Sequence, residues 1–299
     1  MFCTDDKHPS DLLEKGHIDY IIKKAISMGA DPILAIKVAS TNAARYFRLN
    51  NRGAIALGYL ADFVIIDSFE EFTVEQVYKK GKLMYSGGKL KDFRAPTVDE
   101  FLTERAHSTF KVDRLKPEAF KIDRPRGVLG MVPGELMTTD EGYATGVDID
   151  KDILKIAVVE RHNYTGHIGI GYIKGYGLRR GAVATSISHD SHNIIVVGTN
   201  DEDMAAAVNH IAENGGGITV FDGGKCIGDV KLGIAGLMSD APLIDVNRNL
   251  EDAKARVFEL GVSKLIDPFM TLSFMSLPVI PKLRLTTRGV FDVESQSYV

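Results

Sequence analysis

Six short apolar runs, each bounded by glycine or polar turn residues, constrain the fold more than any other feature of the chain. They are ILKIAVVE, IGIGYI, GAVATSI, NIIVVGT, GITVFDG and CIGDVKL. Short runs rich in β-branched residues between turn signals are typical of strands. Helices are predicted at 201–214, where acidic residues fill the first turn, and at 247–260, which Gly261 follows. We therefore predict an α+β domain over residues 126–299.

The part of the chain before residue 126 divides into three further segments. Residues 1–50 are predicted to be helical from Asp19 to Phe47, with a break before Pro32, where Asp31 suits an N-cap. Residues 51–92 change to short β-rich runs: one lies on each side of Gly58, and two more are joined at Lys80-Gly81. Residues 93–125 are charged and rich in proline, as is typical of a connector, with one helix at 98–107.

Composition and charge exclude several classes of function. The 299 residues have a net charge of −4, which argues against a nucleic-acid partner, because neutralising phosphates needs clustered Lys and Arg. The most apolar stretch, 269–280, is interrupted by polar residues and falls short of the ~20 apolar residues of a membrane span; we expect it in the core or at an interface. Cys3 and Cys226 form no CxxC pair, so neither a disulfide framework nor a thiolate zinc site is indicated, and a reducing cytoplasm is expected.

The chain opens with an apolar stub that runs into Thr4-Asp5-Asp6, and this is the first candidate site. If Phe2–Thr4 is a strand, the aspartates stand at its carboxyl end, where the loops of a (β/α)-barrel gather catalytic groups. A carboxylate there can bind a metal ion and accept a proton from metal-bound water. The alternative is an aspartate that caps a helix or makes a turn.

Ser188-His189-Asp190-Ser191-His192-Asn193 is the second candidate site. Ionisable groups so closely spaced beside apolar strands are costly to desolvate unless they are paired or used. On an extended segment His189 and His192 point to opposite faces, so joint action requires a turn; a hydrogen-bonded turn without chemistry is the alternative. For Glu160-Arg161-His162, at the end of a strand, we expect a surface salt bridge rather than a substrate contact.

The order of the segments resembles the carboxyl-terminal half of bacterial adenine deaminases, metal-dependent enzymes of the amidohydrolase superfamily. The resemblance covers nearly the whole chain and lies in FCTDDKHPSDLLEKGHID, RHNYTGHIGIGYIKGYGL, ISHDSHNIIVVGTNDEDMAAAVN, IAGLMSD and DPFMTLSFMSLPVIPKLRLTTRGVFDV. It implies an α/β and α+β fold, in which residues 1–50 are the last βα unit of a TIM-type barrel. Residues 51–92 become part of a small β-sandwich, and 126–299 become the family's accessory domain. Met1 would then lie inside a longer parent.

The resemblance also implies a binuclear divalent metal site, to which this chain supplies Asp5, or Asp6 if the register slips by one. The family builds that site on a His-x-His pair, and none of the eight histidines here forms one. We therefore expect the other ligands in a missing amino-terminal half, and the chain to be inactive alone. The metal is expected to be manganese or iron, with zinc as the alternative, because an aspartate accepts all three.

For the parent, the resemblance implies hydrolysis of adenine to hypoxanthine and ammonia by metal-activated hydroxide. Asp5 would bind metal and shuttle the proton, in a cytoplasmic homodimer of purine salvage. His189, Asp190 and His192 would close the purine pocket or support the metals. Two alternatives remain. One is a dimerisation module without chemistry, which the missing His-x-His and the apolar run 269–280 favour; the other is a cyclic amidase or deacetylase, against which the accessory-domain motifs argue.

Overall fold

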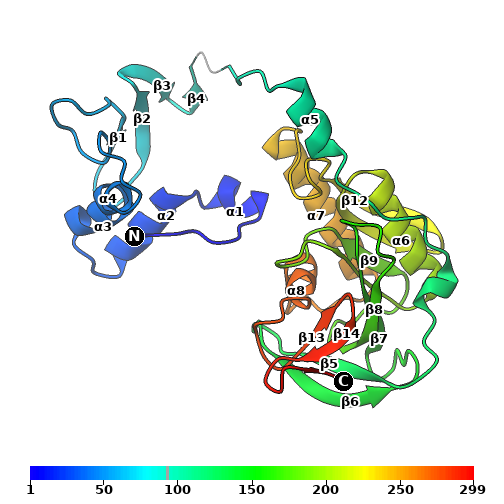
Figure 1. The fold of residues 1–299 in the computed structure, drawn as a ribbon. Coiled ribbons are helices and arrows are strands. Elements are labelled where there is room, and N and C mark those ends of the chain that lie inside the picture. Colours follow the sequence, from blue (N-terminus) through cyan, green and yellow to red (C-terminus); the bar gives the residue numbers. More distant parts are fainter. Residues whose placement is uncertain (92–93) are drawn as a thin grey trace. The chain divides into compact units, whose positions relative to one another are not determined.

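The chain folds into two compact units, Met1–Thr97 and Val98–Val299, in a computed structural model that describes residues 1–91 and 94–299 (Figure 1). The first unit begins with α1 Pro9–Glu14, α2 Ile18–Ser27, α3 Pro32–Ala39 and α4 Thr41–Tyr46. The predicted break before Pro32 is confirmed. Asp31 caps α3, because its Oδ1 accepts a hydrogen bond from the Leu34 amide at 2.8 Å.

A four-stranded antiparallel sheet completes the first unit, in the order β1-β2-β3-β4. Its strands are β1 Phe63–Ile66, β2 Val74–Lys79, β3 Lys82–Ser86 and β4 Lys89–Leu90. β2 and β3 meet at Lys80-Gly81 as predicted, and both turn residues have positive φ (51° and 76°), which matches the twist of a tight hairpin. The strand expected before Gly58 is wrong, because backbone groups there close turns, such as Tyr59 N–H to Ala56 C=O at 3.1 Å.

Residues 1–8, all of them described, form no strand, so the strand expected at Phe2–Thr4 is also wrong. A strand needs a neighbour to pair its backbone N–H and C=O groups. The described strands of this unit pair only with one another. Phe2 instead packs half-buried against the small cluster of Ile22, Ala35 and Phe72.

An eight-stranded sheet forms the centre of the second unit, in the order β12-β11-β9-β10-β7-β8-β5-β6. Its strands are β5 Arg126–Met131, β6 Thr138–Ala144, β7 Ile153–Val159, β8 Ile168–Lys174, β9 Ala182–Thr185, β10 Ile194–Gly198, β11 Gly217–Asp222 and β12 Lys225–Lys231. Neighbouring strands run antiparallel, except β5 and β8, which are parallel. The six predicted strands are confirmed as β7 to β12. β5 and β6 were not predicted.

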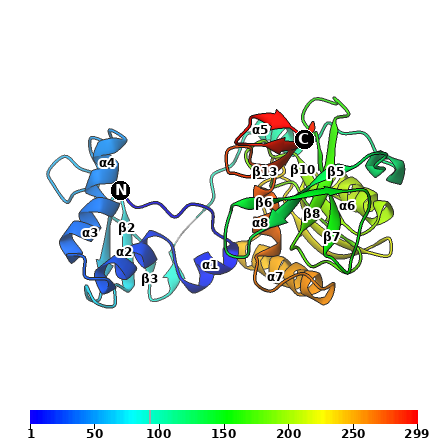
Figure 2. The same cartoon turned by 90° about the horizontal axis from the view of Figure 1, so that it is seen from below.

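Helices cover both faces of this sheet, which gives the second unit three layers (Figure 2). Along β7, Ile156 and Val158 point to one face and Ala157 and Val159 to the other. α7 Leu243–Glu259 and α8 Pro268–Phe274 pack on the first face, and α6 Asp201–Glu213 with the 3-10 turn η1 Pro117–Phe120 on the second. Burial on both faces explains why the strands read as continuous apolar runs. α5 Glu100–His107 precedes these elements and buries no residue.

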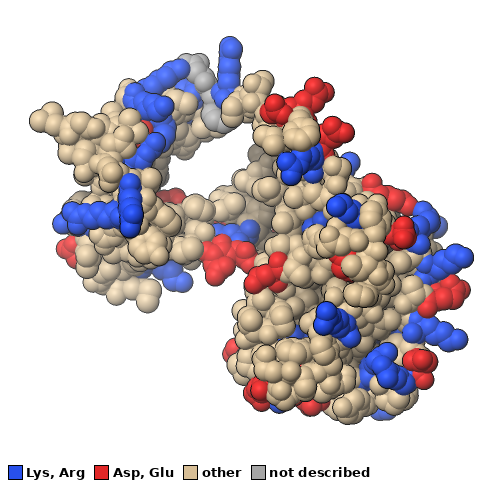
Figure 3. All heavy atoms as spheres, viewed as in Figure 1, with Lys and Arg blue, Asp and Glu red and all other residues tan. Residues whose placement is uncertain are grey.

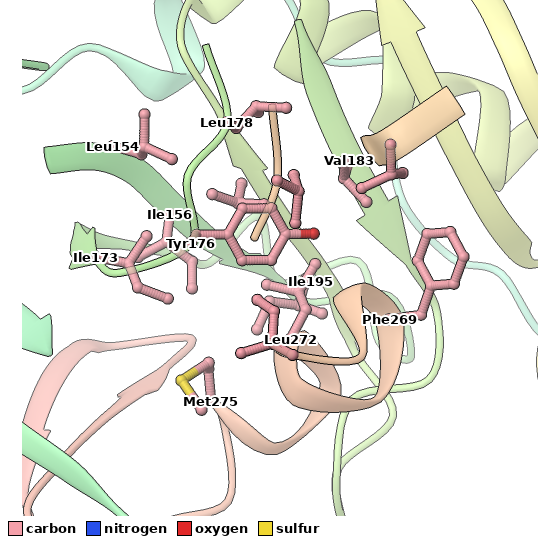
Figure 4. Close-up of a cluster of buried hydrophobic side chains, with 14 of the residues drawn as sticks. Leu154, Ile156, Ile173, Tyr176, Leu178, Val183, Ile195, Phe269, Leu272 and Met275 are labelled. Carbon is pink, nitrogen blue, oxygen red and sulfur yellow. The ribbon is translucent and has the colours of Figure 1, made fainter. Parts of the chain in front are cut away.

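Tyr176 lies within the larger core, among side chains of four strands and of α8 (Figure 4). Its hydroxyl donates a hydrogen bond to the Pro268 carbonyl at 3.1 Å. Burial raises the pKa of this phenol, so the hydroxyl keeps its proton. Phe269, Leu272 and Met275 are buried here, which confirms the apolar run as core up to Leu277, whereas Val279 is 71% exposed.

A second, three-stranded sheet packs against β8. It consists of β13 Leu283–Thr286, β14 Gly289–Asp292 and β15 Ser297–Tyr298. The approach requires glycine in β8, because a Cβ at Gly169 would stand 1.8 Å from the backbone oxygen of Thr286.

Acidic and basic side chains are interspersed over the face of the second unit drawn in Figure 3, which therefore has no broad region of one charge. Among the described residues, no helix combines the length and the apolar character needed to cross a membrane.

Candidate functional site

Asp5 and Asp6 lie in the irregular segment ahead of α1, and both are exposed. Neither caps α1, whose N-cap is His8. The Asp6 amide donates a hydrogen bond to Asp5 Oδ1 at 2.8 Å. Asp5 has a φ of 54°, in the left-handed region that aspartate tolerates better than most side chains.

The surroundings of Asp5 do not fit a metal centre held by this chain alone. Sites for divalent transition metals generally take three or four protein ligands. Over residues 1–91 and 94–299, the only group of three His, Cys, Asp or Glu side chains with converging ligand atoms lies in the second unit. At this end of the chain, Asp5 and Asp6 offer exposed carboxylate oxygens.

Residues 188–193 form a turn between β9 and β10, called the histidine turn below. The His192 amide donates to the carbonyl of Ser188 at 2.6 Å, which closes the turn. The two imidazole rings are thereby brought together, with centroids 5.6 Å apart, whereas an extended segment would separate them. His189 also stacks on Phe274 of α8 at 4.5 Å. Asp190 is exposed, and its Oδ1 lies 3.8 Å from His189 Nδ1.

α8 and the residues just after it hold one side of the histidine turn. The His189 amide donates to the Ser273 carbonyl at 3.0 Å. Ser276 Oγ lies 2.5 Å from Ser188 Oγ and donates to the His189 carbonyl at 3.1 Å. Ser188, Ser273 and Ser276 are all buried, so these bonds are shielded from water.

Arg161, directly after Glu160 at the end of β7, holds the other side of the turn and is only 2% exposed. Its Nε donates to the His192 carbonyl at 2.5 Å, and its Nη2 donates to the Ala235 carbonyl at 3.0 Å. The guanidinium lies over the Phe110 ring, 4.2 Å from its centroid. Burial lowers the pKa of Arg161 to about 10, so the side chain stays charged at neutral pH.

The surface salt bridge expected at Glu160-Arg161-His162 is therefore wrong. Burial alone would raise the pKa of Glu160, but hydrogen bonds from the amides of His162, Thr165 and Asn163 outweigh it and hold that pKa below its ordinary value. His162 Nε2 lies 2.8 Å from the Ser191 carbonyl, so this segment also contacts the histidine turn. The only sequence signal for the role of Arg161 is its place two residues after the end of a largely apolar strand.

The electrostatics of the turn keep His192 neutral. Burial is the largest influence that lowers its pKa from 6.5; His189 and Arg161 lower it further, and Asp190 opposes them. Among the described residues, the buried Nδ1 of His192 has no hydrogen-bond partner. The turn therefore presents a neutral imidazole, a second imidazole and an exposed carboxylate, which can accept, donate or relay protons.

The first unit exposes many large apolar side chains. The buried apolar side chains among its described residues are Ile22, Ala35, Ala44 and Phe72. The exposed ones include Met28, Ile33, Leu34, Tyr46, Phe47, Leu49, Ile55 and Leu57. Leu57 is fully exposed and Ile55 is 89% exposed. So much exposed apolar surface beside so small a core is typical of an interaction surface.

Each of the two units is matched by a model of a known protein family. A family model described as "Amidohydrolase family" matches residues 1–84, and one described as "Adenine deaminase C-terminal domain" matches residues 134–297. Over its full length the chain is 44% identical to adenine deaminase 2 of Carboxydothermus hydrogenoformans and 43% identical to adenine deaminase of Nitratidesulfovibrio vulgaris. It covers 54% and 53% of these proteins. The chain thus spans about half the length of the curated relatives it matches. On these matches, the chain belongs to the adenine deaminase family of amidohydrolases.

Proposed function

We propose that this chain forms the carboxyl-terminal part of an adenine deaminase, which converts adenine and water into hypoxanthine and ammonia. The observation that carries the proposal is the alignment of the whole chain, at 41–44% identity, with relatives named adenine deaminase. The reaction replaces the exocyclic amino group at C6 by oxygen. An amidohydrolase implies a divalent metal for this chemistry.

In this proposal the first unit completes a metal centre whose other ligands lie outside the chain. Asp5 contributes a carboxylate that binds metal and can hold a proton, and Asp6 takes this role if the register differs by one. The metals are a pair of manganese or iron ions, or zinc. The absence of a His-x-His pair supports outside ligands, and the exposed apolar side chains of the first unit support a covering amino-terminal half.

The histidine turn closes the purine pocket in the same proposal. Adenine presents both ring-nitrogen acceptors and an amino donor, which a neutral His192, a second imidazole and the Asp190 carboxylate can complement. The stacking of His189 on Phe274 shows that planar rings can pack at this surface. Purine salvage in the cytoplasm and a homodimer complete the proposal; two exposed free cysteines, Cys3 and Cys226, suit a reducing compartment.

The test combines this chain with the amino-terminal half of the Carboxydothermus adenine deaminase 2, either mixed or fused as one polypeptide. We expect ammonia release from adenine by the combined protein and none by the chain alone. In the fusion, Asp5→Asn should abolish turnover and the neighbouring control Asp6→Asn should not. The reverse result would move the metal ligand to Asp6.

Other outcomes of the same experiment separate the alternatives. Tight association without turnover would instead favour a dimerisation module, and turnover of cyclic amides or acetylated substrates but not adenine would favour another amidohydrolase. His189→Gln and His192→Gln should each lower kcat/KM by about tenfold or more, equivalent to roughly 1.4 kcal/mol. His167→Gln, at an exposed histidine, is the matched control. Unchanged kcat/KM in both turn variants would rule out the closing role.

A further inference from the structure

Three side chains of different chemistry converge where the last turn of α6 meets the edge strand β12. They are His210 of α6 and Cys226 and Asp229 of β12. His210 Nε2 lies 3.2 Å from Asp229 Oδ1 and 3.8 Å from Cys226 Sγ, and the three ligand atoms all lie within 4.8 Å of one another. This group belongs to the second unit and takes no part in the function proposed above.

A β-bulge in β12 puts the two strand residues on the same face. Cys226 and Asp229 are three positions apart, so in a regular strand they would point to opposite faces. In the ladder with β11, however, Val220 pairs with Gly228 and Phe221 with Cys226, which leaves Ile227 without a partner position. The bulge therefore turns Cys226 toward the face covered by α6, where His210 lies. Bulges that re-aim a side chain are over-represented beside functional sites.

The two spacings from His210 Nε2 are close to those around a tetrahedral zinc ion. Zn–N of about 2.05 Å, Zn–O of about 2.1 Å and Zn–S of about 2.3 Å give N···O of about 3.4 Å and N···S of about 3.6 Å in a tetrahedron. The observed distances from His210 Nε2, 3.2 Å and 3.8 Å, bracket these values. A thiolate, an imidazole and a carboxylate together suit a borderline cation better than calcium or magnesium.

Asn214 lies beside the cluster. Its Nδ2 is 3.0 Å from His210 Nε2 and 3.4 Å from Asp229 Oδ2, and it donates to the Asp229 carboxylate. The donor and acceptor roles at His210 Nε2 depend on the tautomer of the ring. A neutral imidazole with a free Nε2 lone pair is the form of histidine that binds metal, so a metal ion at Nε2 replaces its contact with Asn214.

We propose that His210 Nε2, Cys226 Sγ and the Asp229 carboxylate bind one Zn²⁺ ion per chain, with water as the fourth ligand. The thiol of Cys226 loses its proton to solvent when the Zn–S bond forms. Because Cys226 is exposed, the ion can enter from solvent and keep an open position. The ion joins α6 to the edge strand and so stabilises the folded second unit.

The test uses the full chain and zinc itself. After dialysis against Zn²⁺, mass spectrometry of the metal should find one ion per chain, and the Tm should rise by several degrees. Cys226→Ser and His210→Gln should each weaken zinc binding by about tenfold or more. Cys3→Ser, at the other exposed cysteine, and Asp5→Asn should leave it unchanged. Equal zinc affinity in Cys226→Ser and the wild-type chain would overturn the proposal.

A second measurement needs no variant, so it holds even if a substituted chain fails to fold. Zinc should slow the alkylation of Cys226 by iodoacetamide by at least about tenfold and leave Cys3 unaffected, as read from the labelled peptides. Equal labelling of Cys226 with and without zinc would overturn the proposal. Neither readout involves adenine turnover, so failure here is distinguishable from failure of the deaminase proposal.

Discussion

Arg161→Met should destabilise the second unit by about 3 kcal/mol. Methionine keeps an unbranched apolar stem but leaves the buried carbonyls of His192 and Ala235 without their charged donor. Each hydrogen bond to a charged group is worth about 1.5–3 kcal/mol, and the stacking on Phe110 adds about 1 kcal/mol. The variant also recovers part of the desolvation cost of a buried charge, about 1–4 kcal/mol. The net loss is therefore about 3 kcal/mol.

Scanning calorimetry is the suitable assay, because the chain contains no tryptophan. For a unit of this size, roughly 2–4 °C per kcal/mol predicts a fall in Tm of about 6–12 °C. Loss of a nearby positive charge should also raise the pKa of His192, which histidine NMR titration measures.

Arg284→Met provides the matched control. Arg284 is fully buried, its pKa is also lowered to about 10 by burial, and it likewise donates to carbonyls, including that of Ile280 at 2.7 Å. This variant should lower the Tm to a similar extent without shifting the NMR signals of the histidine turn. The reasoning is refuted if Arg161→Met changes the Tm by less than about 2 °C, or if both variants shift those signals equally.

Three further substitutions test other parts of the second unit. Gly169→Ala should cost about 3 kcal/mol or more in thermal unfolding, because the new Cβ would meet the Thr286 backbone oxygen at 1.8 Å. Asn200→Ala should cost about 1 kcal/mol in urea unfolding, since Asn200 Oδ1 accepts the Asp203 amide at 2.7 Å at the start of α6. The folded pKa of His192 is lowered from 6.5, so its contribution to stability is present above that pH and is lost as the pH falls toward the folded value. His192→Asn should therefore flatten the decline of the urea midpoint between about pH 7.5 and pH 5, and an unchanged decline would contradict the assignment.

The elements predicted correctly from sequence are those whose signal comes from residues close together in the chain. The runs that became β7 to β11 carry a strong apolar signal, with most of their residues buried, whereas β12 is mostly exposed or half-buried. Asp31 was predictable as a cap because the interaction spans only three residues. β6 is largely exposed, with the sequence TTDEGYA, so it carries no apolar signal. The strand expected at Phe2–Thr4 failed because a strand depends on a partner, which a local pattern does not specify.

The same distinction holds for the candidate sites: neighbouring residues could be recognised in the sequence, and contacts between distant segments could not. The histidine turn was visible as a cluster of ionisable residues in sequence. Its anchor Arg161 was not, because the carbonyls of His192 and Ala235 come from segments 31 and 74 residues away. The group of His210, Cys226 and Asp229 depends on a one-residue shift of register in β12, and spacing along the chain gives no sign of that shift.

The guanidinium of Arg161 binds the histidine turn through a main-chain oxygen, that of His192, and not through a side chain of residues 189, 190 or 192. Every residue type offers the same carbonyl, so substitution of the side chains at 189, 190 and 192 leaves the anchor intact. Near neutral pH, where His192 adds no pH-dependent change in stability, mutagenesis of these three positions should therefore report on recognition. Over evolutionary time, the same arrangement lets a lineage exchange the chemistry displayed by the turn while its backbone stays in place.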